Sequence, residues 1–234
     1  MKVTFSIPAS LNDVRLQQYQ KYMDILKQNE DVEGGEQFIT AKLVSTMCDV
    51  DYSTLQKMEL TQYEIVVNQL SEVLKEQPKF QKFIELDGIK FGFIPKIDEI
   101  SFGEYIDLEQ YIKDPKDYHK AMGVLYRPVI TTVKETYLIE EYRADEMYAE
   151  AMRQVSLNDT LAALLFFWNL GRELVNCMSR YLQKAKIQTM MDSETSTSST
   201  QNGDGIPALM LSHLETYLNS IPLPVCHYTN ASLN

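Results

Sequence analysis

The spacing of hydrophobic residues changes at Pro78, and this change limits the folds that the chain can adopt. Before Pro78, apolar residues recur every three or four positions, which is typical of amphipathic helices. The expected helices cover residues 11–28, 38–47, 53–58 and 61–76. After Pro78, two short apolar runs flank Asp87-Gly88. An Asp-Gly pair between such runs favours a tight turn, so a β-hairpin is expected within residues 80–100.

Capping residues and prolines set the expected ends of these elements. Ser10 or Asn12 is expected to cap the first helix, and Thr61 with Glu64 forms a capping box for the fourth. Residues 2–7 alternate as a short strand that ends at Pro8. The expected elements after the hairpin are helices over residues 102–113, from Pro115 to Tyr126 before Pro128, 144–153 and 157–185. Propensity leaves residues 129–141 open between strand and helix.

These patterns predict an α+β, mainly α-helical fold: a helical core with a short N-terminal strand and a central β-hairpin. Residues 1–191 form the expected main domain. Residues 192–205 are polar and low in complexity, which predicts a flexible linker. Residues 206–234 then hold a C-terminal amphipathic helix, over 206–219, and a tail.

Composition excludes several classes of protein. The 234 residues are 44% hydrophobic and 24% charged, as in a folded protein with one main core. Acidic residues outnumber basic ones by 33 to 22, so the net charge of −11 opposes general binding to nucleic acid. The longest apolar block, residues 161–168, is far shorter than the roughly 20 residues that span a bilayer. The sequence therefore predicts a cytoplasmic protein that binds neither membranes nor nucleic acid.

Candidate chemical groups do not form a recognisable catalytic or metal-binding motif. Cys48, Cys177 and Cys226 stand far apart without a CxxC pair, which argues against a zinc site and a disulfide framework. The histidines lack metal-binding spacing, and the glycine-rich loops that hold phosphates are absent from the sequence. We therefore expect a protein that is not an enzyme and has no metal or cofactor.

Two weaker patterns have more ordinary explanations. Residues 38–76 have the spacing of a helix-turn-helix, but their acidic character favours helical packing over DNA recognition. An acid–base site would need Glu104 or Asp107 to meet Glu140 or Glu141 in a shielded pocket. Acidic residues spaced in this way more commonly lie on a solvated helix surface.

Several segments resemble small accessory proteins of tailed bacteriophages, most of all tail-assembly chaperones. The resemblance covers about a third of the chain and contains no catalytic motif. Its segments are Phe93-Ile94-Pro95, residues 97–109, Met122-Gly123-Val124-Leu125-Tyr126-Arg127-Pro128-Val129, residues 137–142 and residues 164–171. The resemblance implies a protein-binding factor that shields a phage structural protein, such as a tape measure or another tail protein, in the host cytoplasm. The alternative is a structural minor virion protein, such as a connector or baseplate component.

Aromatic residues and the C-terminal helix are the expected protein-interaction surface, because tyrosine and phenylalanine are enriched at interfaces. The candidate residues are Phe91, Phe93, Phe102, Tyr105, Tyr111, Tyr126, Arg127, Leu209, Leu214 and Tyr217. Ser101, Glu104 and Trp168 are expected to be structural; Ser101 and Glu104 form a capping box. Arg127 is expected to pair with Glu104, Asp107 or Glu109. Oligomeric state, and whether the C-terminal helix binds its own domain or a partner, stay open.

Overall fold

The computed structural model describes residues 5–29, 35–96, 100–134, 136–143 and 146–169. They form a mixed α+β structure that is mostly helical and contains a four-stranded antiparallel sheet, which confirms the expected fold class. The chain divides into two units, residues 1–163 with 230–234, and residues 164–229. The expected domain boundaries at residues 191 and 205 lie outside the described residues.

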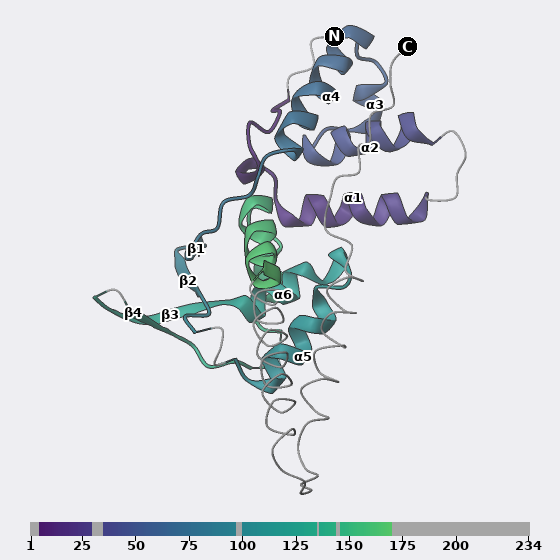
Figure 1. Ribbon diagram of the computed structural model, residues 1–234. Coiled ribbons are helices and arrows are strands. Elements are labelled where there is room, and N and C mark those ends of the chain that lie inside the picture. The colour runs from purple at the N-terminus through teal and green to yellow at the C-terminus, as the bar shows by residue number, and fades with distance from the viewer. Residues whose placement is uncertain (1–4, 30–34, 97–99, 135, 144–145, 170–234) are drawn as a thin grey trace, which may run out of the picture. The chain divides into compact units, whose positions relative to one another are not determined.

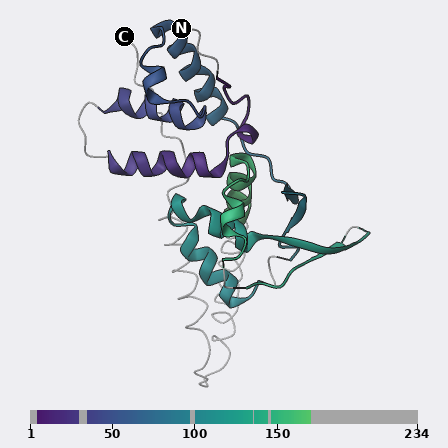
Figure 2. The ribbon, with the colours of Figure 1, turned by 180° about the vertical axis from the view of Figure 1, so that it is seen from behind.

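Helices form the amino-terminal part of the first unit. They are α1 (Leu16–Gln28), α2 (Glu36–Met47), α3 (Tyr52–Leu55) and α4 (Leu60–Leu74). α1 and α2 lie side by side in both views of the ribbon (Figures 1 and 2). Apolar side chains on the facing sides of these helices make the core here, and the most buried are Leu16, Tyr19, Tyr22, Leu43, Val44, Met47, Leu55, Val66, Leu70 and Val73.

The first helix is shorter than expected. Residues 11–28 divide into a 3-10 turn at Leu11–Asp13, capped by Ser10, and α1. Val14 between them is extended and fully buried, and its carbonyl accepts a hydrogen bond from Leu157 N at 2.7 Å. This tertiary contact holds the chain extended where the apolar spacing alone favoured helix. Residues 5–7 are not in a strand, contrary to expectation, and residues 2–4 lie outside the described residues.

The predicted capping box of α4 is wrong. The helix begins at Leu60, one residue before Thr61, and its N-cap is Glu59, which makes no side-chain capping bond. Ile65 is 57% exposed, while Val66 beside it is buried. α4 packs on α2 through one apolar stripe, so only the residues on that stripe are covered.

The sheet contains β1 (Phe83–Leu86), β2 (Ile89–Phe93), β3 (Tyr126–Val133) and β4 (Thr136–Ile139), in the order β1-β2-β3-β4. Its first pair is the expected hairpin. Asp87 and Gly88 both have positive φ, at 49° and 76°, as a type I′ turn requires. The prediction from the Asp-Gly pair is confirmed.

The element before Pro128 is a helix followed by a strand, which corrects the expected helix from Pro115 to Tyr126. α6 spans Tyr118–Leu125, and Tyr126 already belongs to β3. The carbonyl of Pro128 accepts a hydrogen bond from Glu140 N at 3.0 Å. The nitrogen and the carbonyl of one residue point to the same side of a strand, so the Pro128 nitrogen, which carries no hydrogen, also faces β4. The register between β3 and β4 is irregular just after Pro128, between Val129 and Thr131. Proline is tolerated in strands at such irregularities. Residues 129–141, left open by propensity, are therefore largely β structure.

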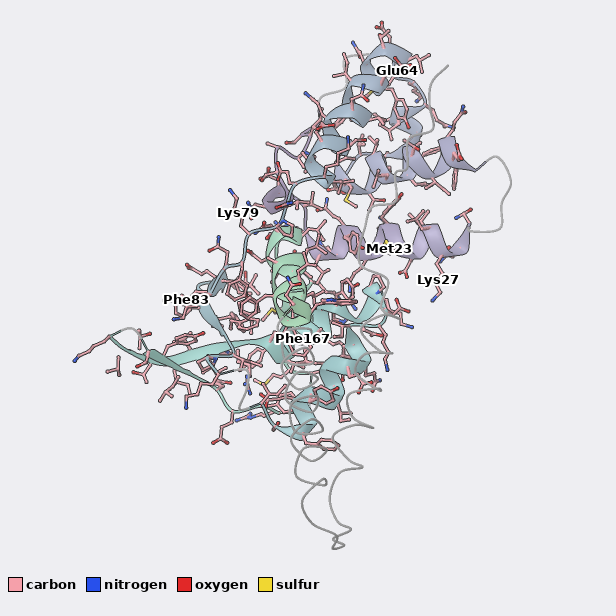
Figure 3. The ribbon with its side chains drawn as sticks, viewed as in Figure 1. Met23, Lys27, Glu64, Lys79, Phe83 and Phe167 are labelled. Carbon is pink, nitrogen blue, oxygen red and sulfur yellow. The ribbon has the colours of Figure 1, made fainter. Side chains whose placement is uncertain are left out.

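The remaining helices are α5 (Phe102–Tyr111) and α7 (Ala149–Met152), which both pack against α6, a 3-10 turn at Pro115–Asp117, and a helix described over residues 157–169. Ser156 caps the last of these, because its Oγ accepts from Asp159 N at 3.0 Å. Asn158 binds the backbone of Lys79, which is labelled in Figure 3. Its side-chain oxygen accepts from Lys79 N at 2.9 Å, and its side-chain nitrogen donates to Lys79 O at 3.1 Å. Within the described residues, no helix is long and apolar enough to cross a membrane.

Candidate functional site

Four of the predicted interaction residues are buried, so the prediction that they form a surface is wrong. Phe91, Phe93 and Tyr126 are 2%, 4% and 0% exposed, and Arg127 is buried as well. The rings of Phe93 and Tyr126 meet edge to face, with centroids 5.3 Å apart, and Phe91 meets Tyr148 at 5.5 Å. These strands turn their aromatic side toward the core, which the sequence pattern does not reveal.

Three predicted residues on α5 lie at or near the surface. Phe102 is 80% exposed, and Tyr105 and Tyr111 are partly exposed. Ile106 lies one turn after Phe102 and is 41% exposed, so both are apolar surface positions on α5. Leu209, Leu214 and Tyr217 lie outside the described residues, and Trp168 is partly exposed.

Arg127 and Glu104 form a buried ion pair, which is one of the three pairings expected for Arg127. Arg127 Nη2 lies 2.7 Å from Glu104 Oε1, and their side chains are only 9% and 8% exposed. Glu104 Oε2 accepts from Ser101 N at 2.6 Å, and Ser101 Oγ accepts from Glu104 N at 3.3 Å. The predicted capping box is therefore present, and it holds the carboxylate in place for Arg127. The same pair joins the start of α5 to the start of β3.

Tyrosine–carboxylate hydrogen bonds involve the segment after β4. Tyr142 donates to Asp107 of α5, and Tyr111 of α5 donates to Glu146 at 3.1 Å. Burial, with a smaller effect of the Glu146 carboxylate, raises the pKa of Tyr111 to about 12. Tyr142 and Tyr111 thus remain protonated donors at neutral pH. These two hydrogen bonds join Tyr142 and Glu146 to α5.

The acid–base site considered from the sequence lacks its expected geometry. Glu104 binds Arg127, and Asp107 accepts from Tyr142. Glu140 accepts from Tyr148 OH at 2.6 Å. A cavity of about 30 Å³ is lined by Glu141 but by neither Glu104 nor Asp107, and it has room for about one water molecule. Glu104, Asp107 and Glu140 thus each hold another segment of the chain in place through a hydrogen bond or an ion pair.

A second buried polar cluster joins α1, α6 and the end of α7. Arg153 Nη2 lies 3.0 Å from His119 Nε2, and Arg153 Nη1 donates to Gln20 Oε1 at 2.9 Å. Gln20 Nε2 contacts the carbonyls of Pro115 and Lys116 and His119 Nδ1, at 2.9 to 3.0 Å. Burial and the Arg153 charge lower the pKa of His119. His119 is 2% exposed and is held neutral beside a cation.

Metal chemistry has no candidate site in the described part of the chain, where histidine, cysteine and acidic side chains form no group that could hold an ion. Cys48 is buried, which raises the pKa of its thiol to about 11. A protonated thiol is a poor nucleophile and a poor ligand. Cys177 and Cys226 lie outside the described residues.

A set of exposed apolar side chains that sequence reasoning missed lies on the β3–β4 hairpin. We call Ile130, Val133 and Leu138 the hairpin surface; they are 65%, 61% and 62% exposed. The hairpin extends away from α5 and α6 in both ribbon views (Figures 1 and 2), and side chains stand on both of its faces (Figure 3). Propensity does not decide between strand and helix for residues 129–141, and only their assignment as strands would predict alternating outward positions here.

Comparison with protein-family models, with curated proteins and with solved structures found no match to this chain.

Proposed function

We propose that this chain is a non-enzymatic protein-binding factor in tailed-phage virion assembly, acting as a tail-assembly chaperone. The hairpin surface is the observation that supports it best. Three large apolar side chains on one hairpin are each more than 60% exposed. Clusters of exposed apolar side chains are typical of protein-binding sites.

The energetic gain from covering this surface suits reversible binding. Full burial of a valine, leucine or isoleucine contributes about 1.5–3 kcal/mol, and about 60% of each hairpin-surface side chain remains to be covered. Covering all three therefore contributes roughly 3–5 kcal/mol before the costs of association are subtracted. A binding site of this strength can release its partner, a phage tail protein, when that protein enters the assembly.

The base of the hairpin is anchored, so the hairpin surface has a fixed support. β3 begins at buried Tyr126 and at the Arg127–Glu104 pair. Tyr137 of β4 is 6% exposed and donates a hydrogen bond to the carbonyl of Phe93 in β2 at 2.5 Å. An anchored binding element loses less conformational entropy when a partner binds than a disordered one.

The acidic character and the resemblance to phage proteins complete the proposal. A net charge of −11 keeps a protein with exposed apolar groups soluble, which suits a carrier of an aggregation-prone partner. The assignment to phage assembly, and to a tail protein such as a tape measure as the partner, rests on the sequence segments described above.

The test is affinity capture of tagged full-length protein from phage-infected host cells, with mass spectrometry of the eluate and of finished particles. The double variant Ile130→Thr/Val133→Thr removes apolar area while keeping β-branched side chains. The matched control is Leu60→Gln/Ile65→Gln, which removes two exposed apolar side chains from α4.

We expect wild type and the control to capture a phage structural protein, the hairpin variant to lose it, and finished particles to lack the chain. Equal capture by the hairpin variant would contradict the role of the hairpin surface. A chain retained in particles would replace the chaperone by the structural minor virion protein, a connector or baseplate component. Truncation after Met191 tests the predicted contribution of Leu209, Leu214 and Tyr217.

A further inference from the structure

β4 has a neighbouring strand on one side only within the described residues, because the strand order places it at the edge of the sheet. Glu140 N–H donates to Pro128 O of β3. Backbone groups alternate in direction along a strand, so Leu138 and Thr136 also face β3, and Tyr137 and Ile139 face away from it. No backbone hydrogen bond to that outer side is found among the described residues.

This edge lacks two of the features that usually prevent strands from pairing with other chains, a charge and a proline. The four residues of β4, Thr-Tyr-Leu-Ile, include neither a charge nor a proline. Leu138 is 62% exposed, and Val133, which shares its face because it pairs with Thr136, is 61% exposed. An apolar edge with free backbone groups is a template for another strand.

We propose that β4 pairs antiparallel with β4 of a second copy of this chain, about a two-fold axis that passes beside Leu138. In this register Tyr137 lies opposite the partner's Ile139, and the symmetry repeats the pair. Each pair exchanges N–H···O bonds in both directions, so the outward backbone groups of Tyr137 and Ile139 all acquire partners. The inference does not rest on the proposed function, although Leu138 belongs to both surfaces.

Side chains support the same register. Leu138 meets its own copy in a non-hydrogen-bonded pair, where facing side chains come closest, at about 4.5 Å between Cα atoms. On the other face of the sheet, the register sets Tyr137 opposite the partner's Ile139. An aromatic side chain facing a β-branched one is a cross-strand pair that stabilises antiparallel strands, and the two-fold axis repeats it.

The dimer should be weak and dependent on concentration, since a four-residue edge buries less area than a standard interface. The test is sedimentation of the full-length chain, of 27.0 kDa, over a range of concentrations. Leu138→Lys places two cations face to face at the axis, where like charges destabilise pairing. We expect its dissociation constant to rise about fivefold or more.

The control is Val133→Lys, which adds the same charge on the same face at a similarly exposed position of β3, away from the edge. It should dimerise like wild type. Leu138→Glu alone should be weakened like Leu138→Lys, and an equal mixture of the two should associate again, which also shows that both variants fold. A wild-type chain that stays monomeric at every concentration, or a mixture that does not associate, would overturn the inference.

Discussion

Replacing Arg127 by methionine tests the buried ion pair that joins α5 to β3. The change removes the cation but keeps an apolar chain of similar length, so Glu104 is left buried, with Ser101 N–H as its remaining hydrogen-bond donor. Removing one partner of a buried pair costs about 3–5 kcal/mol, because the other charge stays buried without compensation. At about 2–4 °C per kcal/mol for a unit of this size, the melting temperature should fall by roughly 6–20 °C.

The assay is urea and thermal unfolding followed by circular dichroism at neutral pH. Arg127→Met/Glu104→Gln removes both charges, and the glutamine oxygen can still accept from Ser101 N–H, so the double variant should recover most of the loss. The surface control is Lys75→Met, since Lys75 and Glu72 are 64% and 75% exposed, and it should change stability by less than about 1 kcal/mol. A loss below about 1 kcal/mol for Arg127→Met, or a double variant no more stable than the single one, would refute the reasoning.

Three further outcomes follow from close contacts and burial. In Gly92→Ala the new Cβ would lie 2.5 Å from a ring carbon of Tyr137, and the ring cannot move freely because its hydroxyl is bonded to the backbone of Phe93. Urea unfolding should show a free energy of unfolding lower by about 1–3 kcal/mol. Gly103→Ala, whose new Cβ has its nearest contact at 3.7 Å, should show no such loss. The pKa of His119 is lowered below 6.5 in the folded state, so its contribution to stability is complete above pH 6.5 and is lost as the pH falls from 6.5 through the folded value. The free energy of unfolding should therefore be smaller at pH 5.5 than at pH 7.5, and His119→Gln should reduce this difference. Because burial raises the pKa of Cys48 to about 11, this thiol should resist alkylation at pH 8 until the protein unfolds, as peptide mapping can measure; rapid labelling of the folded chain would contradict it.

Local signals predicted several elements correctly. The Asp87-Gly88 turn and the Ser101–Glu104 capping box are present, because a two-residue turn and a first helical turn depend on residues within four positions of each other. Arg127 was also assigned to an ion pair, with Glu104 among its expected partners, because it is one of few cations in an acidic stretch. The structure selects Glu104 because the capping box fixes its carboxylate beside the start of β3.

Errors arose where distant parts of the chain decide the local state. Val14 is extended because it bonds to Leu157, more than a hundred residues away, although its neighbours favour helix. Tyr126 begins a strand because β2 offers it a partner in Phe93. Neither partner is visible in a local window of sequence.

The sequence by itself determined the α+β class, the first hairpin, the α5 cap and the acidic character of the protein, since each depends on composition or on neighbouring residues. Only the tertiary structure decided which hydrophobic residues are accessible. Phe91, Phe93 and Tyr126 are as apolar as an interface residue, yet they are buried, while Ile130, Val133 and Leu138 are exposed. The physical reason is that hydrophobicity measures the gain from leaving water, whereas burial requires another element to cover the side chain, and that depends on contacts between residues far apart in the chain.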